Sequence, residues 1–320
     1  IGTNNGLNRY DPQRQGFVRH NHQPTTPNSL ANDTVVSIFE DSSNVLWVGT
    51  DGGGLSKYNR QQDHFAYYRA NPDDPASLSG NFIMPIILGE NGTAWVGAYG
   101  TGLNRLNAIS NQFRRYVHDP NNPNSISTNE IISLKLDSSG NLWIGTTIGL
   151  DRLDPDTGLF THFVPDITNP ESLSAAPVNV IYEDHSNTIW VGTSRGLDQF
   201  DPQSQVFIKY DTEDNDPNSF DDNQITSILE DENLNFWIGT FDDGAKLFNP
   251  SNGEIISYTN NPDNPTSLGS NAVLCLHIDH AGTLWIGTAG GGLNRYEPET
   301  DSFTRFTEKD GLPNDVIYGI

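Results

Sequence analysis

The side chains best suited to binding chemistry are aromatic, acidic and basic residues that stand in short turns. An aromatic ring can stack on a sugar ring, while carboxylates and a guanidinium form hydrogen bonds with hydroxyl groups. At the same turns, other copies of an internal repeat have Gly, Asn, Thr or Ala. Packing that all copies share therefore does not explain why these turns carry aromatic and charged residues. The alternative is that each is simply a solvated turn residue. The candidates for a ligand-binding site are Tyr99, Arg195, Phe241, Asp242 and Asp243.

The sequence contains no recognisable motif for catalysis, for cofactor binding or for metal binding. His20 and His22 could both reach one metal ion, but no third ligand stands near them. The single cysteine, Cys275, excludes an internal disulfide and a multi-cysteine zinc site. No G-x-S-x-G segment is present to hold a nucleophilic serine. We therefore predict no catalytic residue, no cofactor site and no metal site.

An aspartate recurs at one position of a turn in five copies of the repeat. Its carboxylate can accept backbone N–H bonds in an Asx-type turn. Calcium binding is the alternative, but no copy places carboxylates at positions 1, 3, 5 and 12 as a known calcium loop does. We expect a turn-stabilising role for these residues, which are Asp41, Asp137, Asp184, Asp231 and Asp279.

A cation also recurs at one position, shortly after the conserved Gly-Leu pair of the repeat. A ring of such cations could bind an anionic ligand. The prediction we favour is that their stems lie along a neighbouring sheet and their charged ends pair with the turn carboxylates. The residues are Arg9, Lys57, Arg105, Arg152 and Arg295.

The overall charge limits the classes of partner. The 320 residues carry 17 Lys and Arg against 41 Asp and Glu, a net charge of −24. No basic stripe is available to neutralise phosphates, so nucleic acid is excluded as a partner. No run approaches the 18 apolar residues that would indicate a membrane-spanning helix, so we expect no direct membrane insertion by this segment.

Six tryptophans set the period of the internal repeat. Each opens a run reading WVGT, WVGA or WIGT, and the spacings between them are 48, 48, 47, 47 and 48 residues. The chain itself begins IGT, which is a seventh copy of the same run. A fixed period in this range is typical of solenoids and propellers. The tryptophans are Trp47, Trp95, Trp143, Trp190, Trp237 and Trp285.

Each repeat contains four apolar runs of strand length separated by turn residues. Residues 34–69 show the pattern as TVVSIFED, VLWVGT, GLSKYN and HFAYYR. Short runs rich in Val, Ile, Trp, Tyr and Phe between Gly, Asn, Asp and Pro predict strands. Four strands per unit of this length predict one blade of a β-propeller, and blades must stack because one sheet cannot bury both of its faces.

The fold class predicted is therefore all-β: a seven-bladed β-propeller of four-stranded antiparallel blades. The chain starts partway through a blade and ends on the strand that this blade lacks, so we expect the N- and C-terminal segments to pair and close the ring. We also expect the ring to be part of a longer protein. The predicted blades are 314–320 with 1–20, 33–69, 81–118, 129–164, 176–211, 223–259 and 271–307.

The repeat resembles that of the two-component regulator propeller family. The resemblance rests on the segments LWVGTDGGGLSKYN, LWIGTTIGLDRLDP, LWIGTAGGGLNRYEP and DGLPND, and it covers essentially the whole chain. It implies an extracytoplasmic, periplasmic sensor region of a hybrid histidine kinase or diguanylate cyclase in bacteria. The expected partner is an extracellular small molecule or oligosaccharide, and a homodimer could form through the parent protein.

Three functions remain open at this point. The first is a non-catalytic sensor module that binds a ligand, such as a glycan, and relays it to a cytoplasmic output domain. The second is a protein-interaction scaffold. The third, a propeller lyase or hydrolase acting on a polysaccharide, would need paired carboxylates or a His-Tyr-Arg cluster at the channel mouth.

Overall fold

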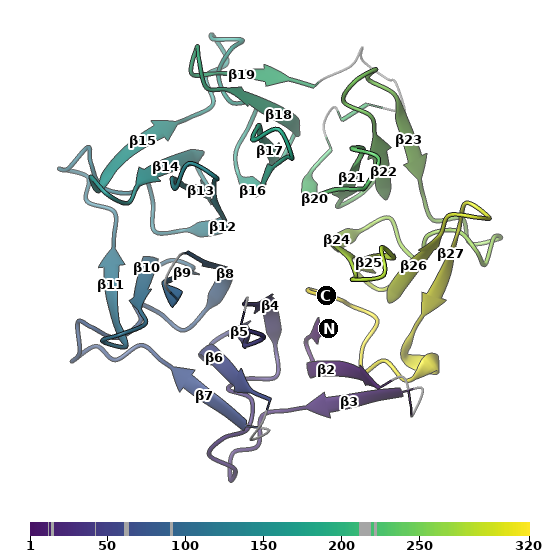
Figure 1. Ribbon diagram of the computed structural model, residues 1–320, viewed down its shortest axis with the longest axis horizontal. Helices are drawn as coiled ribbons and strands as arrows, with labels where there is room; N and C mark the ends of the chain where they lie inside the picture. Colours follow the sequence, from purple (N-terminus) through teal and green to yellow (C-terminus); the bar gives the residue numbers. More distant parts are fainter. Residues whose placement is uncertain are drawn as a thin grey trace.

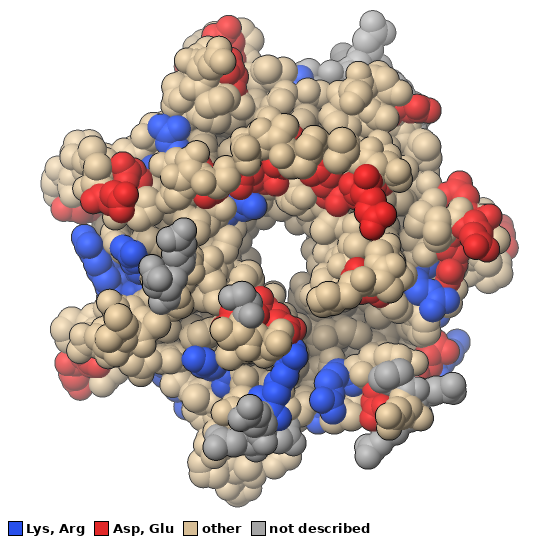
Figure 2. Space-filling model, in the orientation of Figure 1, with Lys and Arg blue, Asp and Glu red and all other residues tan. Residues whose placement is uncertain are grey.

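Short apolar strands are arranged as seven antiparallel sheets in a ring (Figure 1), and the space-filling view shows a channel at its centre (Figure 2). The computed structural model describes residues 1–11, 13, 16–41, 43–60, 64–89, 92–210, 219–220 and 223–320. Six sheets have four strands each, in chain order from the channel outward, and the seventh contains three. The predicted seven-bladed, all-β propeller is confirmed. Residues 12, 14, 15, 42, 61–63, 90, 91 and 211 of the predicted blades lie outside the described residues.

In the six four-stranded blades the strands follow the predicted order of inner, second, third and outer strand. In the seventh, the predicted inner strand 314–320 is held by isolated bridges, Gly2–Gly319 and Ala289–Val316. In the described part of the chain, a short 3-10 helix, η2 (Glu308–Asp310), stands before the last segment. No helix among the described residues is long and apolar enough to cross a membrane. The strands are β1 (Gly2–Thr3), β2 (Gly6–Asp11) and β3 (Gly16–His20); β4 (Val35–Glu40), β5 (Leu46–Thr50), β6 (Gly54–Asn59) and β7 (His64–Tyr68); β8 (Ile83–Leu88), β9 (Ala94–Ala98), β10 (Gly102–Asn107) and β11 (Gln112–Tyr116); β12 (Ile131–Leu136), β13 (Leu142–Thr146), β14 (Leu150–Asp154) and β15 (Leu159–Phe163); β16 (Val178–Glu183), β17 (Ile189–Thr193), β18 (Gly196–Asp201) and β19 (Val206–Lys209); β20 (Ile225–Glu230), β21 (Phe236–Thr240), β22 (Ala245–Phe248) and β23 (Ile255–Tyr258); β24 (Val273–Ile278), β25 (Leu284–Thr288), β26 (Leu293–Glu297) and β27 (Ser302–Phe306).

The tryptophans of the second strands form the core between blades. Trp47 of β5 packs with residues of its own blade and with Ile83, Ala94 and Leu106 of the next one. Trp143 of β13 reaches the following blade in the same way. Burial of a large aromatic surface at six of the seven boundaries joins neighbouring sheets, as the repeat predicts.

The repeated aspartates stabilise the turn between the inner and second strands. Asp41 Oδ1 accepts the backbone N–H groups of Ser43 (2.8 Å) and Val45 (2.9 Å), which confirms the predicted Asx-type turn. Its Oδ2 accepts the indole N–H of Trp47 at 3.1 Å, a contact that sequence reasoning missed. The same aspartate–indole bond is formed by Trp143 (2.7 Å), Trp190 (2.9 Å) and Trp285 (2.9 Å).

The predicted pairing of the recurrent cations with these carboxylates is wrong. In the ladder, Lys57 stands opposite Trp47, so its ammonium lies over that indole ring, 4.9 Å from the centroid. The equivalent guanidinium groups of Arg105 and Arg152 lie 5.1 Å and 5.4 Å from the indole centroids of their own blades. In these three blades the cation therefore covers the tryptophan of its own sheet by a cation–π contact, while Asp41 and Asp137 accept N–H donors. Arg295 differs, since its Nη2 lies 2.7 Å from Glu297 Oε1 and its guanidinium lies 5.9 Å from the Phe306 centroid.

The two ends of the chain meet in one sheet (Figure 1). Gly2 of β1 pairs antiparallel with Gly319, and Ala289 pairs with Val316. Gly2 N donates to Gly319 O at 2.8 Å, and Tyr318 N donates to Gly2 O at 2.9 Å. The predicted closure of the ring by its terminal segments is confirmed.

Candidate functional site

The turns between second and third strands form a ring at one mouth of the channel. The backbone N–H of Tyr99 donates to Phe82 O (2.9 Å), and that of Phe241 donates to Gln224 O (3.0 Å), where each inner strand begins. A glycine later in the same turn reaches the next blade, as Gly244 N does to Asn271 O at 2.9 Å. These turns are therefore fixed on both sides, and their side chains lie on a single face.

The structure places the two predicted aromatic residues at equivalent positions of that face. Tyr99 follows β9 and Phe241 follows β21, with exposed fractions of 36% and 43%. The Tyr99 ring also contacts Phe82, with 5.7 Å between centroids. Two blades separate them, so they occupy the same ring without forming one cluster. Arg195, which is also exposed, lies in the blade of β16–β19, next to that of Phe241.

The acidic turn of Asp242 and Asp243 is supported by a buried cation. Lys246 of β22 is 0% exposed, and its Nζ lies 2.7 Å from Asp243 Oδ2 and 3.3 Å from Ser257 Oγ. Asp242 is exposed to solvent. The ammonium beneath the turn holds the Asp243 carboxylate in place beside Phe241.

Sequence reasoning missed Lys246 because it considered departures only in the turns. At the equivalent buried position the other blades carry smaller neutral or acidic side chains. A lysine at an otherwise uncharged or acidic interior position is a clear signal, since Lys is almost never fully buried without a partner. The equivalents are Asn8, Ser56, Asn104, Asp151, Asp198 and Asn294.

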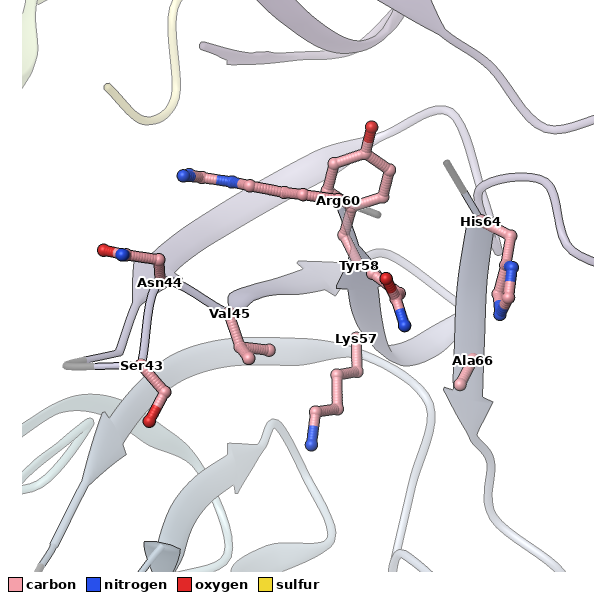
Figure 3. A pocket seen from close by; sticks show the side chains of 9 residues that line it. Ser43, Asn44, Val45, Lys57, Tyr58, Arg60, His64 and Ala66 are labelled. Carbon is pink, nitrogen blue, oxygen red and sulfur yellow. The ribbon is translucent and has the colours of Figure 1, made fainter. Parts of the chain in front are cut away.

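A second candidate is a pocket in the blade of β4–β7 (Figure 3). It is bounded by the turn at Ser43–Val45, by the end of β6 and by β7. Lys57, Arg60 and His64 line it, which is unusual in a chain of net charge −24. Arg60 is paired with Glu40, at 2.7 Å between Nη2 and Oε2. The pocket could accept an anionic or hydroxyl-rich group, and sequence reasoning did not identify it.

The charges in Figure 2 are unevenly distributed over the face in view. Acidic side chains border the channel beside β16 and β20, whereas Lys and Arg lie mainly over β2, β6, β11 and β26. At the ends of two inner strands, glutamates bind the preceding blade: Glu183 accepts from Ser138 N (2.8 Å), and Glu230 accepts from His185 N (2.9 Å). These carboxylates therefore hold adjacent blades together.

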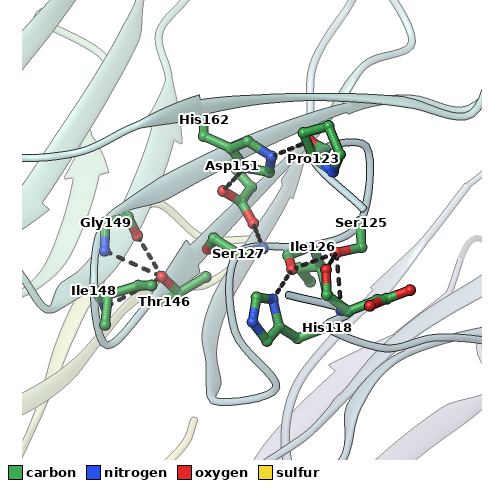
Figure 4. A network of polar contacts seen from close by, with 11 residues as sticks. His118, Pro123, Ser125, Ile126, Ser127, Thr146, Ile148, Gly149, Asp151 and His162 are labelled. Atoms are coloured by element: carbon green, nitrogen blue, oxygen red, sulfur yellow. Dashed lines mark hydrogen bonds and ion pairs between the residues drawn. The ribbon is translucent and has the colours of Figure 1, made fainter. Parts of the chain in front are cut away.

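A histidine–aspartate pair lies in the blade of β12–β15 (Figure 4). His162 Nδ1 is 2.7 Å from Asp151 Oδ1, and its Nε2 is 3.1 Å from Pro123 O. Asp151 is buried and accepts the backbone N–H of Ser127 at 2.8 Å. Because the second ring nitrogen faces a carbonyl and not a hydroxyl, this pair fixes the loop that enters the blade and does not form a nucleophilic triad.

We predict that this pair makes stability depend on pH. The hydrogen bond that the His162 ring donates to the Asp151 carboxylate is the main cause that raises the pKa of His162 above its ordinary value, while partial burial opposes it. A raised folded-state pKa stabilises the protein fully below the unfolded pKa of about 6.5, and that contribution is lost as pH rises through the folded pKa. Urea unfolding between pH 5 and 9 should show this decline in wild type, and H162Q should flatten it. An unchanged pH profile in H162Q would contradict the assignment.

The two histidines considered as metal ligands and the single cysteine each have structural surroundings. His22 Nδ1 lies 2.7 Å from Leu30 O, whereas the His20 ring packs 5.3 Å from that of Tyr58. Within the described part of the chain, no three His, Cys, Asp or Glu side chains are grouped so that they could hold a metal ion. Burial raises the pKa of the Cys275 thiol to about 12, which keeps it protonated and unreactive at neutral pH.

Comparison with known proteins supports the resemblance seen in the repeats. The family model described as two component regulator propeller matches residues 29–52, 125–147, 172–195 and 267–290. No curated protein sequence matches the chain significantly.

Several solved structures are similar to the chain. The extracellular domain of BT3049 from B. thetaiotaomicron, described as a hybrid two component system, is 26% identical with a TM-score of 0.76, over 92% of this chain and 37% of that one. The corresponding domain of BT4673 is 26% identical with a TM-score of 0.52, over 95% of this chain and 39% of that one. The chain thus spans less than half the length of either.

A third similar structure shares the fold alone. Virginiamycin B lyase from Staphylococcus aureus is 14% identical with a TM-score of 0.62, over 88% of this chain and 86% of that one. The matched ranges lie in four different blades. Each runs from the loop before the inner strand to the end of the second strand, and so includes the position of the recurring aspartate and the tryptophan. Four of the repeats are therefore of the two-component regulator propeller type.

Proposed function

We propose that this propeller is a non-catalytic, extracytoplasmic sensor module of a bacterial two-component or diguanylate-cyclase signalling protein. It binds an extracellular ligand and relays binding to a cytoplasmic output domain. The side chains in its turns suit a glycan as that ligand. The observation that carries this proposal is the 26% identity and TM-score of 0.76 with the extracellular domain of BT3049 over 92% of the chain.

The ligand-binding site we propose is the turn face at the channel mouth. Phe241 and Tyr99 present exposed rings on which a sugar can stack. Asp242, Asp243 and Arg195 supply hydrogen-bond acceptors and donors for hydroxyl groups. Lys246 holds the Asp243 carboxylate before a ligand arrives, so less ordering is needed on binding.

A panel of oligosaccharides tests this function directly. A ligand that binds the folded state raises the unfolding temperature, and the rise grows with the logarithm of its concentration above Kd. We expect at least one neutral or uronic oligosaccharide to raise Tm, and calorimetry then gives its affinity. Chromatography of the same glycan after long incubation should show it unchanged. New products would overturn the non-catalytic assignment, and no response across the panel would overturn the glycan ligand.

Replacement of the two aromatic rings should weaken binding of that glycan. We expect F241A or Y99A to raise Kd by about tenfold or more, since loss of a stacking side chain at a binding hot spot costs roughly 1–2 kcal/mol or more. The control is I109A, in the same blade as Tyr99, because Ile109 is 96% exposed in the hairpin between β10 and β11. Calorimetry measures all three. Unchanged affinity in both aromatic variants would remove the turn face as the site.

A further inference from the structure

A cavity of about 530 Å³ lies at the boundary between the blade of β20–β23 and that of β24–β27. Its volume falls within the range of about 300–1,000 Å³ that is usual for small-molecule sites. One wall is the turn between β20 and β21, and the other is the turn between β24 and β25 together with the end of β26. The lining residues used below are Asp231, Glu232, Trp237, Arg295, Tyr296 and Glu297.

Trp237 lacks both of the polar partners found at the equivalent tryptophans. Each of the others donates its indole N–H to a turn aspartate, lies under a cation, or does both. The N–H of Trp237 donates to no residue that the structure describes, and Leu247 stands opposite it in the ladder, at the position of the recurrent cation. The aspartate bonds are those of Trp47, Trp143, Trp190 and Trp285, and the cation contacts are those of Trp47, Trp95 and Trp143.

The aspartate of this blade nevertheless holds its usual turn. Asp231 Oδ1 accepts the backbone N–H groups of Asn233 at 2.8 Å and Asn235 at 2.9 Å, while its Oδ2 accepts no hydrogen bond from the described residues. Trp237 is 3% exposed and lines the same cavity as Asp231, so its N–H meets what enters that cavity. Buried donors are almost always hydrogen-bonded in native proteins. A hydroxyl fits between the two groups, because it can accept from the indole and donate to the carboxylate.

The cavity wall carries a net negative charge. Arg295 is neutralised within the wall, because its Nη2 lies 2.7 Å from Glu297 Oε1. Asp231 and Glu232 form no ion pair with any residue that the structure describes. The Glu232 carboxylate extends toward the next blade, since a Cβ added at Gly282 would lie 3.7 Å from its Oε1. Two carboxylates without a counter-charge therefore border the cavity.

The equivalent place in another blade has the opposite charge. The pocket of Figure 3 lies at the same turn and the same hairpin of the β4–β7 blade, and Lys57, Arg60 and His64 line it. By repeat register, Pro298 stands where Arg60 does. The acidic wall is thus particular to this boundary and is not imposed by the fold, which favours a cationic ligand here.

We propose that this cavity binds a hydroxyl-bearing organic cation, namely an amino sugar with a free amine. A sugar hydroxyl accepts the Trp237 N–H and donates to Asp231, and the ammonium lies beside Glu232. The carbon face of the sugar packs on Tyr296, whose ring centroid is 4.9 Å from that of Trp237. This site lies at the opposite end of β21 from the turn of Phe241, so the inference goes beyond the proposed turn-face site and does not depend on it.

The first test is an NMR titration of the ¹⁵N-labelled chain with glucosamine, N-acetylglucosamine and ethanolamine. We expect glucosamine to shift the indole N–H signal of Trp237, which is assigned by its loss in W237F. N-acetylglucosamine keeps the ring without the charge and should bind at least about tenfold more weakly, because charge-assisted hydrogen bonds are the stronger ones. Ethanolamine lacks the ring and should also bind more weakly. No shift with glucosamine, or equal affinity for either of the other two probes, would overturn the proposal.

A matched pair of tryptophan variants tests the indole N–H. W237F removes a donor that has no protein partner, so it should weaken glucosamine binding by about threefold or more while costing little stability. W190F removes a donor that is bonded to Asp184 at 2.9 Å, so it should lower stability clearly and leave glucosamine binding unchanged. If the two variants weakened binding equally, or lost the same stability, Trp237 would not be the free donor that the proposal requires.

A matched pair of glutamate variants locates the ammonium. E232Q removes one carboxylate of the wall and should weaken glucosamine binding severalfold. E254Q makes the same change at an exposed glutamate before β23 of the same blade and should leave binding unchanged. F241A should also leave it unchanged, which separates this site from the turn face. A loss of glucosamine binding in F241A, with none in E232Q, would place the amine on the turn face and overturn the inference.

Discussion

Replacement of Trp143 by alanine is expected to lower the free energy of unfolding by about 3–5 kcal/mol, the cost of removing a large buried aromatic side chain. Trp143 is 2% exposed and packs against Phe163 in a stacked geometry at 5.9 Å and against Phe200 edge-on at 4.9 Å. Phe200 belongs to the next blade, so the variant opens a cavity between two sheets. Urea unfolding followed by far-UV circular dichroism measures the loss.

Trp285 provides the matched control for that experiment. It has the same aspartate bond but is only partly buried, because its neighbour is the three-stranded blade. W285A should therefore cost clearly less than W143A. Equal losses at both positions would show that burial between blades is not what makes these residues stabilising.

Alanine at Gly54 is expected to destabilise the fold by about 2–5 kcal/mol, by two effects that add. The residue has a φ of +85°, where an L-residue costs roughly 1–2 kcal/mol. An added Cβ would also lie 2.3 Å from the carbonyl oxygen of Tyr68, a backbone atom that cannot move away cheaply. Overpacking of this kind costs about 1–3 kcal/mol more. Chemical unfolding of G54A checks the sum.

Gly52 separates the two effects. Its φ is +83°, but a Cβ there would meet nothing within 4 Å. G52A should therefore cost only the conformational part, about 1–2 kcal/mol. If G52A and G54A lost the same stability, the contact with Tyr68 would have no role in requiring glycine at the start of β6.

The fold was predictable because the same pattern of strands and turns recurs seven times along the chain. One copy of LWVGT flanked by turns is ambiguous, but six tryptophans at a period of 47 or 48 residues require one sheet per period. Closure followed from counting strands, and the Gly2–Gly319 bridge confirms it. The partner of Lys57 was not predictable in this way, because a cation may pair with a carboxylate or with an aromatic face. Which partner Lys57 takes depends on the cross-strand register, and that register places Lys57 opposite Trp47.

The candidate site was only partly predictable for a related reason. Departures from the repeat identify Phe241 and Asp243, but they do not show that Lys246 lies beneath them, fully buried. Nor could the pocket at Lys57, Arg60 and His64 be found from departures, since it forms between a turn and a hairpin of one blade. The position of a residue in the repeat predicts the face of the ring on which it lies. Which side chains contact one another could be seen only in the folded structure.

The bridge between Gly2 and Gly319 has a consequence for the order of the chain. Because the N- and C-terminal segments lie side by side in the ring, no blade has to come first in the sequence. A circular permutant that links Ile320 to Ile1 through a short linker, and begins instead at another outer-to-inner connection, would keep the blade-to-blade contacts. The architecture thus depends on which sheets are neighbours and not on their order along the sequence.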